Sequence, residues 1–330
     1  MKPGNAFRLG VTLYSFNAEF YSYKYSFEEC MEKASSLGEG QGVEIVGPQM
    51  IRSFPELSEE FERQFKRLVD RYGLRPSAYG AYADPQRITG RLLTRSEQID
   101  YLKLQLQAAQ RLGFPVIRVQ AVEPVFSDLV PYAEKLGVKM GIEIHSPMKI
   151  EEMDKTITRV EQVGSEYLGF IPDCGAFCHS CAKVYVERFL QLGVPRNFVE
   201  RILQRWKERM PAEAIISEVK AMGGDDLAQM MAMESCIYFG HSDPSSLKRI
   251  MPYIVHVHGK FFGIDEMGIE SAVRFPEVVR ILKAGGFSGY MSCEYEGHHW
   301  LHDGDAFSQI QSLQKLIREQ LGTSAETKMA

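Results

Sequence analysis

Acidic and imidazole side chains stand at the ends of four short apolar runs in the second half of the chain. The runs carry Glu143-Ile144-His145, Asp173, His256-Val257-His258 and Glu294-Tyr295-Glu296. Charged side chains rarely occupy buried strand ends unless they are paired or bind a metal. One group from each run gives three carboxylates and one imidazole, a set that suits a hard or borderline divalent ion. We therefore expect a metal centre, with Mn²⁺ as the first choice and Mg²⁺ or Co²⁺ as alternatives.

The spacing within each run places pairs of these residues on one face of a strand. Side chains alternate between the two faces, so Glu143 and His145 point the same way, and so do His256 and His258. A single strand histidine is more often a core group with satisfied hydrogen bonds than a ligand. Four successive runs with the same feature favour the metal centre over that reading.

These runs are the last four of eight β-rich segments, each followed by a helical pattern. Such an alternation indicates repeated βα units and a parallel sheet. Eight units close a (β/α)₈ TIM barrel, and the strand ends that carry the acidic groups then meet at one mouth. We therefore expect residues 1–330 to form one barrel domain. The segments lie at about 9–14, 42–47, 75–82, 115–121, 139–145, 168–173, 253–259 and 289–297.

The connection after the sixth segment is unusually long. Nearly 80 residues separate Asp173 from Tyr253. Residues 184–237 read as several helices, because prolines and glycines interrupt the helical pattern at Gly193, Pro195, Pro211 and Gly223–Gly224. Insertions in the βα loops of a barrel lie on the active-site face. We interpret 180–250 as a helical insertion that caps the site or docks a partner; a surface elaboration without a role is the alternative.

Composition narrows the class of protein. The chain of 330 residues has a formal net charge of -5, which argues against nucleic-acid binding. No run of about 18 apolar residues predicts a membrane span. The N-terminus lacks a signal-peptide pattern, and six cysteines are too few for a disulfide framework. We expect a cytoplasmic protein with reduced thiols.

The order Glu, Asp, His, Glu on the last four strands resembles the xylose isomerase-like barrel superfamily of sugar isomerases and epimerases. The stretch HVHGKFFGID resembles its seventh-strand motif, in which a second histidine binds metal and a lysine follows. The stretch LKAGGFSGYMSCEYEG resembles its final strand. The resemblance implies a ligand set of Glu143, Asp173, His258 and Glu294, with His256 in reserve if the strand register differs, and Lys260 as the motif lysine.

A narrower resemblance rests on EIHSP, MPYIVHVHGKFF and CEYEGHHW, at 143–147, 251–262 and 293–300. These stretches are similar to the larger, α subunit of bacterial C-glycoside deglycosidases. The resemblance implies cleavage of the carbon–carbon bond between an aromatic aglycone and a 3-oxo-glucosyl group, and a small β subunit in a hetero-oligomer. It also implies that His145 is catalytic.

The residue types fit that chemistry. A ketone at C3 acidifies the C2 proton, a cation stabilises an enediolate-type intermediate, and an imidazole with a pKa near neutrality moves the proton. Lys260 is expected to orient a substrate oxygen, unless it is a surface lysine. A sugar or cyclitol isomerase or epimerase needs the same chemistry and remains the alternative, followed by a non-catalytic scaffold subunit. The expected substrate contacts are Tyr14, Tyr79, Gln120, His179, His256, Glu296 and His298.

Overall fold

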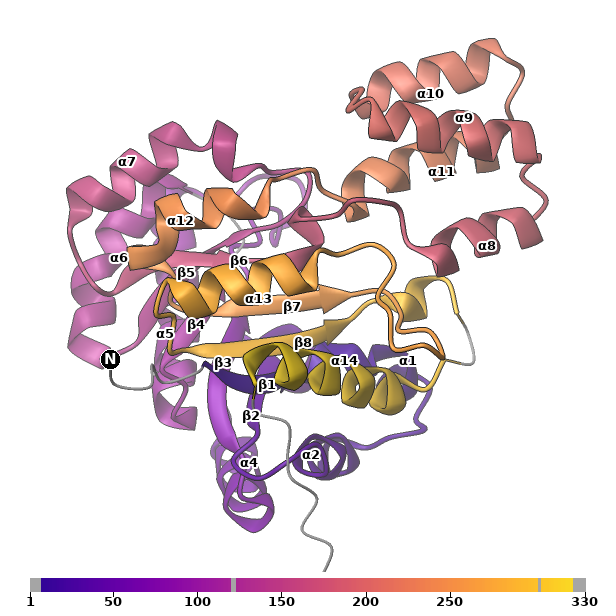
Figure 1. The fold of residues 1–330 in the computed structure, drawn as a ribbon. Coiled ribbons are helices and arrows are strands. Elements are labelled where there is room, and N and C mark those ends of the chain that lie inside the picture. Colours follow the sequence, from indigo (N-terminus) through magenta and orange to yellow (C-terminus); the bar gives the residue numbers. More distant parts are fainter. Residues whose placement is uncertain (1–6, 120–122, 302–303, 323–330) are drawn as a thin grey trace, which may run out of the picture.

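The computed structural model describes residues 7–119, 123–301 and 304–322. Eight parallel strands in these ranges form one sheet in the order β6-β5-β4-β3-β2-β1-β8-β7. Parallel bridges from Phe170 to Ile254 and from Asp173 to His258 join the two edge strands. The (β/α)₈ TIM barrel predicted from the sequence is thereby confirmed (Figure 1). The strands are β1 (Arg8–Thr12), β2 (Gly42–Val46), β3 (Arg75–Ala81), β4 (Val116–Val119), β5 (Lys139–Ile144), β6 (Leu168–Pro172), β7 (Val257–Phe261) and β8 (Tyr290–Tyr295).

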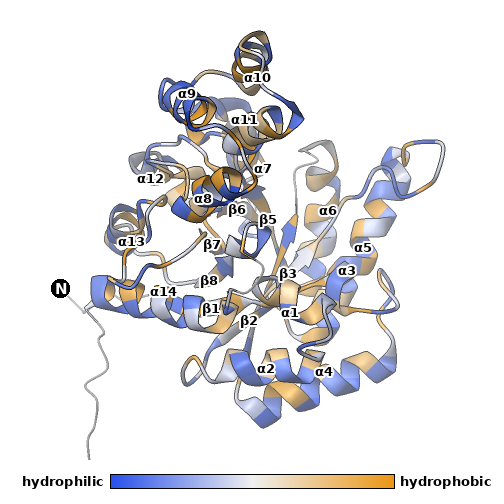
Figure 2. Cartoon of the chain, turned by 90° about the vertical axis from the view of Figure 1, so that its right-hand side faces the viewer, coloured by the Kyte–Doolittle hydropathy of each residue, from blue (hydrophilic) through white to orange (hydrophobic). Residues whose placement is uncertain are grey.

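Helices cover the outside of the barrel, and local signals in the sequence set their ends. Thr94 and Glu97 form a capping box at the start of α5, and Gly113 ends that helix in the left-handed conformation. Surface helices such as α4 bury one apolar side and expose a charged one (Figure 2). Apart from the four helices that follow β6 most closely, described below, the helices are α1 (Asn17–Tyr21), α2 (Phe27–Ser35), α3 (Gly47–Met50), α4 (Glu59–Tyr72), α5 (Arg95–Leu112), α6 (Glu123–Leu136), α7 (Asp154–Val163), α12 (Leu247–Ile250), α13 (Phe275–Ala284) and α14 (Ala306–Leu321).

The seventh strand begins later than the sequence pattern indicates. We expected it at 253–259, but Met251–Tyr253 forms a short 3₁₀ helix and β7 covers Val257–Phe261. Proline at 252 favours this turn because it has no N–H to donate to a sheet. The shift places His258 and Lys260 inside the strand, two positions apart on one face.

A small apolar plug fills the barrel axis below the mouth. Ala78, Val116 and Ile171 are buried together, with Val255 packed against them. These side chains come from β3, β4, β6 and the segment before β7. The plug supports the polar side chains at the C-terminal ends of the strands, which is where barrel enzymes place their active sites.

The helices expected after the sixth strand are present. They are α8 (Lys183–Gln191), α9 (Arg196–Lys207), α10 (Ala212–Ala221) and α11 (Asp226–Tyr238). Figure 1 shows α9, α10 and α11 as a lobe set off from the barrel. Aromatic contacts join the insertion to the mouth: Tyr185 of α8 and Phe239, which follows α11, pack against Trp300, with ring centroids 5.3 and 5.8 Å from the indole. The Trp300 indole N–H also donates a hydrogen bond of 3.1 Å to Glu234 of α11. The insertion therefore packs against the loop that follows β8.

No helix in the described ranges is long and apolar enough to cross a membrane.

A buried carboxyl between β7 and α13 gives a test of the fold. Glu270 accepts backbone hydrogen bonds from Ala272, at 2.8 Å, and from Val273. Burial raises its pKa from 4.5 to about 7. A raised native pKa means that the associated stability is present below pH 4.5 and is lost as the pH rises through about 7.

Replacing this group with a neutral amide should remove the pH dependence. We expect the melting temperature of Glu270→Gln minus that of the unmodified protein to be larger at about pH 8 than at about pH 5. At roughly 1.4 kcal/mol per pKa unit, the change in relative stability is at most about 3 kcal/mol. Thermal unfolding of both proteins at the two pH values measures it. A difference that stays constant with pH would contradict the assignment.

Candidate active site

Four strands bring the predicted ligands together at the barrel mouth. Glu143 lies on β5, Asp173 directly follows β6, His258 lies on β7 and Glu294 on β8. All four are buried, and one ligand atom from each lies within 4.8 Å of the others. The bridge between Asp173 and His258 aligns the ends of β6 and β7. The described part of the chain therefore contains a compact cluster of three carboxylates and an imidazole.

The geometry of this cluster fits a cation. The Nδ1 atom of His258 lies 2.9 Å from Glu143 Oε1 and 3.1 Å from Glu294 Oε2. The buried Oε2 atoms of Glu143, Glu294 and Glu296 accept no hydrogen bond of good geometry within the described part of the chain. Buried polar atoms normally have hydrogen-bond or ion partners, so these carboxylate oxygens fit a bound cation as their partner. An oxygen-rich set with one imidazole suits a divalent ion such as Mn²⁺ or Mg²⁺.

The pKa values of the cluster residues point the same way. Burial raises the pKa of Glu143, but Arg118 and His258 lower it more, so that it lies far below its usual range. Burial raises the pKa of Glu294, but Lys260 and His258 lower it more, so that it lies below its usual value. Both carboxylates are therefore ionised at neutral pH, as metal ligands must be.

Lys260 is buried beside the cluster rather than at the surface. Its Nζ atom lies 2.9 Å from Asp173 Oδ2 and 3.2 Å from Glu296 Oε1. Burial lowers the pKa of Lys260, but Asp173 and Glu296 raise it well above the usual value. Burial also raises the pKa of Glu296 to about 8, although Lys260 opposes this shift. Lys260 is thus a fixed cation, whereas burial favours the protonated form of Glu296.

Tyr14 and His298 lie on the same side of the mouth. Their rings are 5.7 Å apart. Burial, followed by the charges of Glu296 and Glu294, raises the pKa of the Tyr14 phenol far above its usual value. Burial lowers the pKa of His298, and neither of its buried ring nitrogens has a side-chain hydrogen-bond partner among the described residues. These two side chains therefore present polar groups beside the carboxylates.

His145 directly follows β5 and is half-buried. Its Nδ1 atom contacts the carbonyl oxygen of Ser146. A carbonyl only accepts, so this contact favours the tautomer with its proton on Nδ1 and Nε2 as the free nitrogen. A positive charge on His145 would also lower the pKa of Glu143, by less than Arg118 and His258 do.

Two of the predicted substrate contacts, Tyr79 and His179, are not brought to the cluster. Tyr79 is fully buried against Phe114, 5.9 Å between ring centroids, in the core between barrel and helices. Its neighbour Ala78 faces the barrel axis, and alternation along β3 turns Tyr79 the other way. His179 is exposed at the surface. Partial burial of its ring, and then the charge of Arg274, lower its pKa. Gln120 lies outside the described residues. The positions of Tyr79 and His179 give no support to substrate contacts.

Two buried charges at the site were missed by the sequence reasoning. Glu44 on β2 lies 3.1 Å from His258 Nε2 and 3.3 Å from His256 Nε2. Arg118 on β4 lies 3.6 Å from Glu143 Oε2, and its guanidinium carbon is 4.9 Å from the centre of the Tyr82 ring. Each is the single charge in a short apolar run, GVEIV or VIRV. That isolated charge was the available signal, because a strand buried on both faces tolerates one only when it is paired.

The fold and the cluster define a class: a (β/α)₈ barrel with a candidate metal centre in its C-terminal mouth. The chain belongs to the xylose isomerase-like TIM barrel family, whose model matches residues 31–320. The resemblance stated from the motifs is thereby confirmed.

The chain is also similar to individual relatives over nearly its full length. The chain is 39% identical to the 3'-dehydrocarminate deglycosidase alpha subunit of Microbacterium sp, over 96% of this chain and 95% of the relative. It is 33% identical to the C-glycoside deglycosidase alpha subunit of Microbacterium trichothecenolyticum, over 97% and 93% of the two chains. Among solved structures, D-psicose 3-epimerase in the presence of D-fructose matches with a TM-score of 0.58 over 96% of this chain and 100% of that chain. At 12% identity this last likeness concerns the fold alone.

Proposed function

We propose that this protein is the catalytic subunit of a metal-dependent C-glycoside deglycosidase, a carbon–carbon lyase. Its substrates are 3-oxo-C-glucosides of aromatic aglycones. The observation that carries the proposal is full-length similarity to a 3'-dehydrocarminate deglycosidase alpha subunit in a chain that also contains the buried ligand cluster. Glu143, Asp173, His258 and Glu294 would hold the ion. A complete cluster of this kind argues against a non-catalytic scaffold.

The surrounding residues suit the reaction. A divalent ion, when bound, supplies positive charge that stabilises negative charge on the substrate oxygens. His145 takes the C2 proton through Nε2, the C1–C2 double bond forms as the C1–aglycone bond breaks, and a proton returns to the aglycone carbon. Lys260 donates hydrogen bonds toward the sugar oxygens from its place between Asp173 and Glu296. Tyr14 and His298 contact the sugar or the flat aglycone.

A direct assay tests the proposal against the isomerase or epimerase alternative. The metal-loaded protein, with and without a co-expressed small subunit, is incubated with a 3-oxo-C-glucoside and separately with free ketoses. Release of the aglycone supports the proposal. Epimerisation of a free ketose without aglycone release would overturn it.

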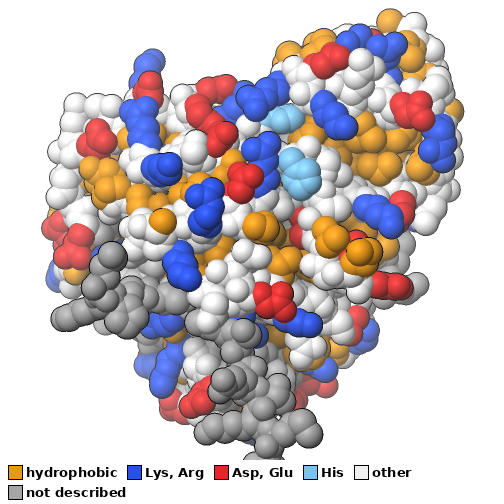
Figure 3. Space-filling view, in the orientation of Figure 1, with side chains coloured by type: hydrophobic (Ala, Val, Ile, Leu, Met, Phe, Trp, Pro, Cys, Tyr) orange, Lys and Arg blue, Asp and Glu red, His pale blue; other side chains and the backbone are white. Residues whose placement is uncertain are grey.

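The partner is the second part of this proposal. Both relatives named above are alpha subunits, and on that ground we expect a stable complex with a smaller subunit. Helix α11 exposes Met230, Met233 and Ile237 along one face. Figure 3 shows hydrophobic side chains exposed on the lobe that α9–α11 occupy in Figure 1. We propose this face as the docking surface for the small subunit.

A charge on that face should weaken the complex. Met233→Glu is expected to reduce affinity at least about tenfold, because docking would bury an unpaired carboxylate. Leu104→Glu on α5 is the matched control, since Leu104 is 40% exposed and Met233 43%. Co-elution of each variant with the co-expressed small subunit measures the effect. Equal co-elution of both variants would reject this surface, and full activity of the chain alone would reject the partner.

A further inference from the structure

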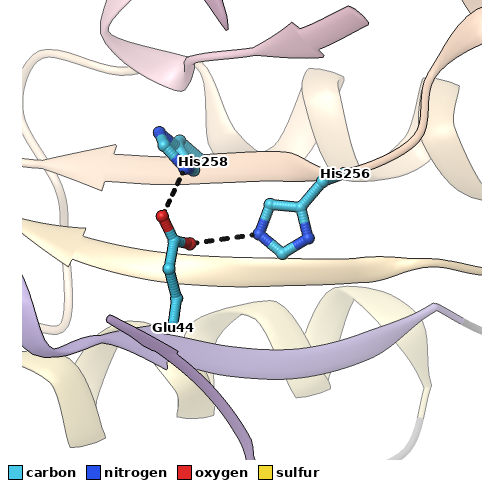
Figure 4. A group of neighbouring side chains, drawn as sticks. All are labelled: Glu44, His256 and His258. Carbon is cyan, nitrogen blue, oxygen red and sulfur yellow. Dashed lines mark hydrogen bonds and ion pairs between the residues drawn. The ribbon is translucent and has the colours of Figure 1, made fainter. Parts of the chain in front are cut away.

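Glu44 lies between two histidines inside the barrel. One carboxylate oxygen is 3.1 Å from His258 Nε2, and the other is 3.3 Å from His256 Nε2. Figure 4 shows each oxygen directed at one imidazole. All three side chains are about 1% exposed. A carboxylate at this depth is stabilised only by groups that donate hydrogen bonds or carry positive charge, so this contact is part of the site's architecture.

The two ring nitrogens of His258 face different groups. Nδ1 lies 2.9 Å from Glu143 Oε1 and 3.1 Å from Glu294 Oε2, on the side of the ligand cluster. Nε2 faces Glu44 Oε1 on β2, 3.1 Å away. A nitrogen that binds a cation must be unprotonated, so in the neutral ring the proton then resides on Nε2. Glu44 is placed to accept it.

We propose that Glu44 is a positioning residue that holds His258 in the tautomer and orientation needed to bind the cation through Nδ1. Carboxylates that accept a hydrogen bond from a metal-binding imidazole fix its orientation and raise its basicity. This inference rests on the metal centre put forward under the proposed function. It adds a residue from β2, a strand that supplies none of the four ligands.

His256 and Ser292 complete the arrangement. The Nε2 atom of His256 lies 2.9 Å from Ser292 Oγ as well as 3.3 Å from Glu44. Ser292 pairs with His258 in the register of β7 and β8. The second oxygen of Glu44 lies beside the His256 ring without a hydrogen bond of good geometry, while the first meets His258. His256 therefore lies against Glu44 and is hydrogen-bonded to Ser292 of the neighbouring strand.

A competing assignment makes Glu44, His256 and His258 a second metal site. Their ligand atoms also lie within 4.8 Å of one another. Two ions at these positions would share the His258 ring, which would then have to lose both of its ring protons. A neutral imidazole holds its second proton far more tightly than its first, so the hydrogen bond to Glu44 is the favoured arrangement. The number of ions bound per chain distinguishes the two.

Metal titration of purified variants tests the inference. Glu44→Ala is expected to weaken Mn²⁺ binding about 10- to 100-fold, and Glu44→Gln, which keeps an acceptor oxygen, by less. Glu270→Gln is the matched control, because it changes a buried carboxyl that touches neither histidine. Unchanged affinity in Glu44→Ala, or an equal loss in Glu270→Gln, overturns the proposal. Two ions per unmodified chain, with one lost in Glu44→Gln, would overturn it in favour of a second site.

A measurement on the unmodified protein keeps the test independent of how the variants fold. Nitrogen-15 NMR of the imidazoles, with the protein loaded with diamagnetic Mg²⁺, reports which ring nitrogen carries the proton. A proton on Nε2 of His258 supports the proposal, and a proton on Nδ1 overturns it. If the unmodified chain binds no divalent ion, the metal centre and this inference fail together. If the unmodified chain and the Glu44 variants bind ions equally well, only this inference fails.

Discussion

Replacing Glu294 with glutamine is expected to remove the bound ion and to reduce turnover at least a thousandfold. The Oε2 atom of Glu294 lies 3.1 Å from His258 Nδ1, and one ligand atom of Glu294 is within 4.8 Å of those of Glu143 and Asp173. An amide supplies no charge to a hard divalent ion and binds it weakly. Charge stabilisation by such an ion contributes several kcal/mol, and each 1.4 kcal/mol is about tenfold in rate.

Metal content and turnover are measured on the same preparations. The control is Glu19→Gln, another buried carboxyl, whose Oε1 accepts a hydrogen bond of 3.4 Å from the backbone of Ala306 outside the cluster. Treatment of the unmodified protein with a chelator should reproduce the loss, and added Mn²⁺, Mg²⁺ or Co²⁺ should reverse it. Full activity in metal-free protein would refute the metal centre.

The barrel was predictable because its local signals agree with one another. Alternating β-rich and helical runs, glycines after helices and eight repeats all indicate the same fold, which the sheet order confirms. The strand that begins elsewhere is β7, where Pro252 sits in a 3₁₀ turn and delays the start of pairing. The HVHGKFFGID motif still identified His258 and Lys260 as site residues. Their residue types mark them, and the exact strand boundary is not needed.

The ligand cluster was predictable because four neighbouring runs share the same feature. Site residues that stand alone in a strand were harder to predict. Four acidic or imidazole strand ends together indicate a metal centre, whereas Glu44 and Arg118 are single charges within apolar strands. Their importance depends on which face of the strand points inward, and strands buried on both faces have no alternation to reveal it. The same ambiguity made Tyr79 look available, although it faces the helices.

The packing of the insertion was beyond the reach of the sequence pattern. Prolines and glycines marked the ends of its helices, and these helices are present. Their contact with the mouth depends on residues far apart in the chain, such as the hydrogen bond from Trp300 to Glu234. That contact joins the loop after β8 to α11, and it ties a lobe proposed to dock a partner to the same loop that carries His298.

His145→Ala is expected to reduce turnover at least about a hundredfold while leaving metal content unchanged. His145 directly follows β5, two residues after Glu143, and we expect the alternation of the strand to continue through it, which would turn both side chains to the same chamber about 6.6 Å apart along the strand. The contact of Nδ1 with the Ser146 carbonyl leaves Nε2 as the basic nitrogen, as a general base at neutral pH requires. Loss of a positioned general base typically reduces rate by 10²- to 10⁴-fold, which is the expected range.

The alternative is that His145 only supports Glu143, on whose pKa it acts. In that case the variant would bind metal more weakly, and excess metal would restore most of the turnover. His179→Ala is the comparison, since His179 is exposed and lies outside the ligand cluster; we expect less than a tenfold change there. Metal content, turnover at saturating metal and the pH profile are therefore measured together. A base contributes the acidic limb of the profile, and a supporting residue does not, so loss of that limb with full metal content assigns His145 to proton transfer.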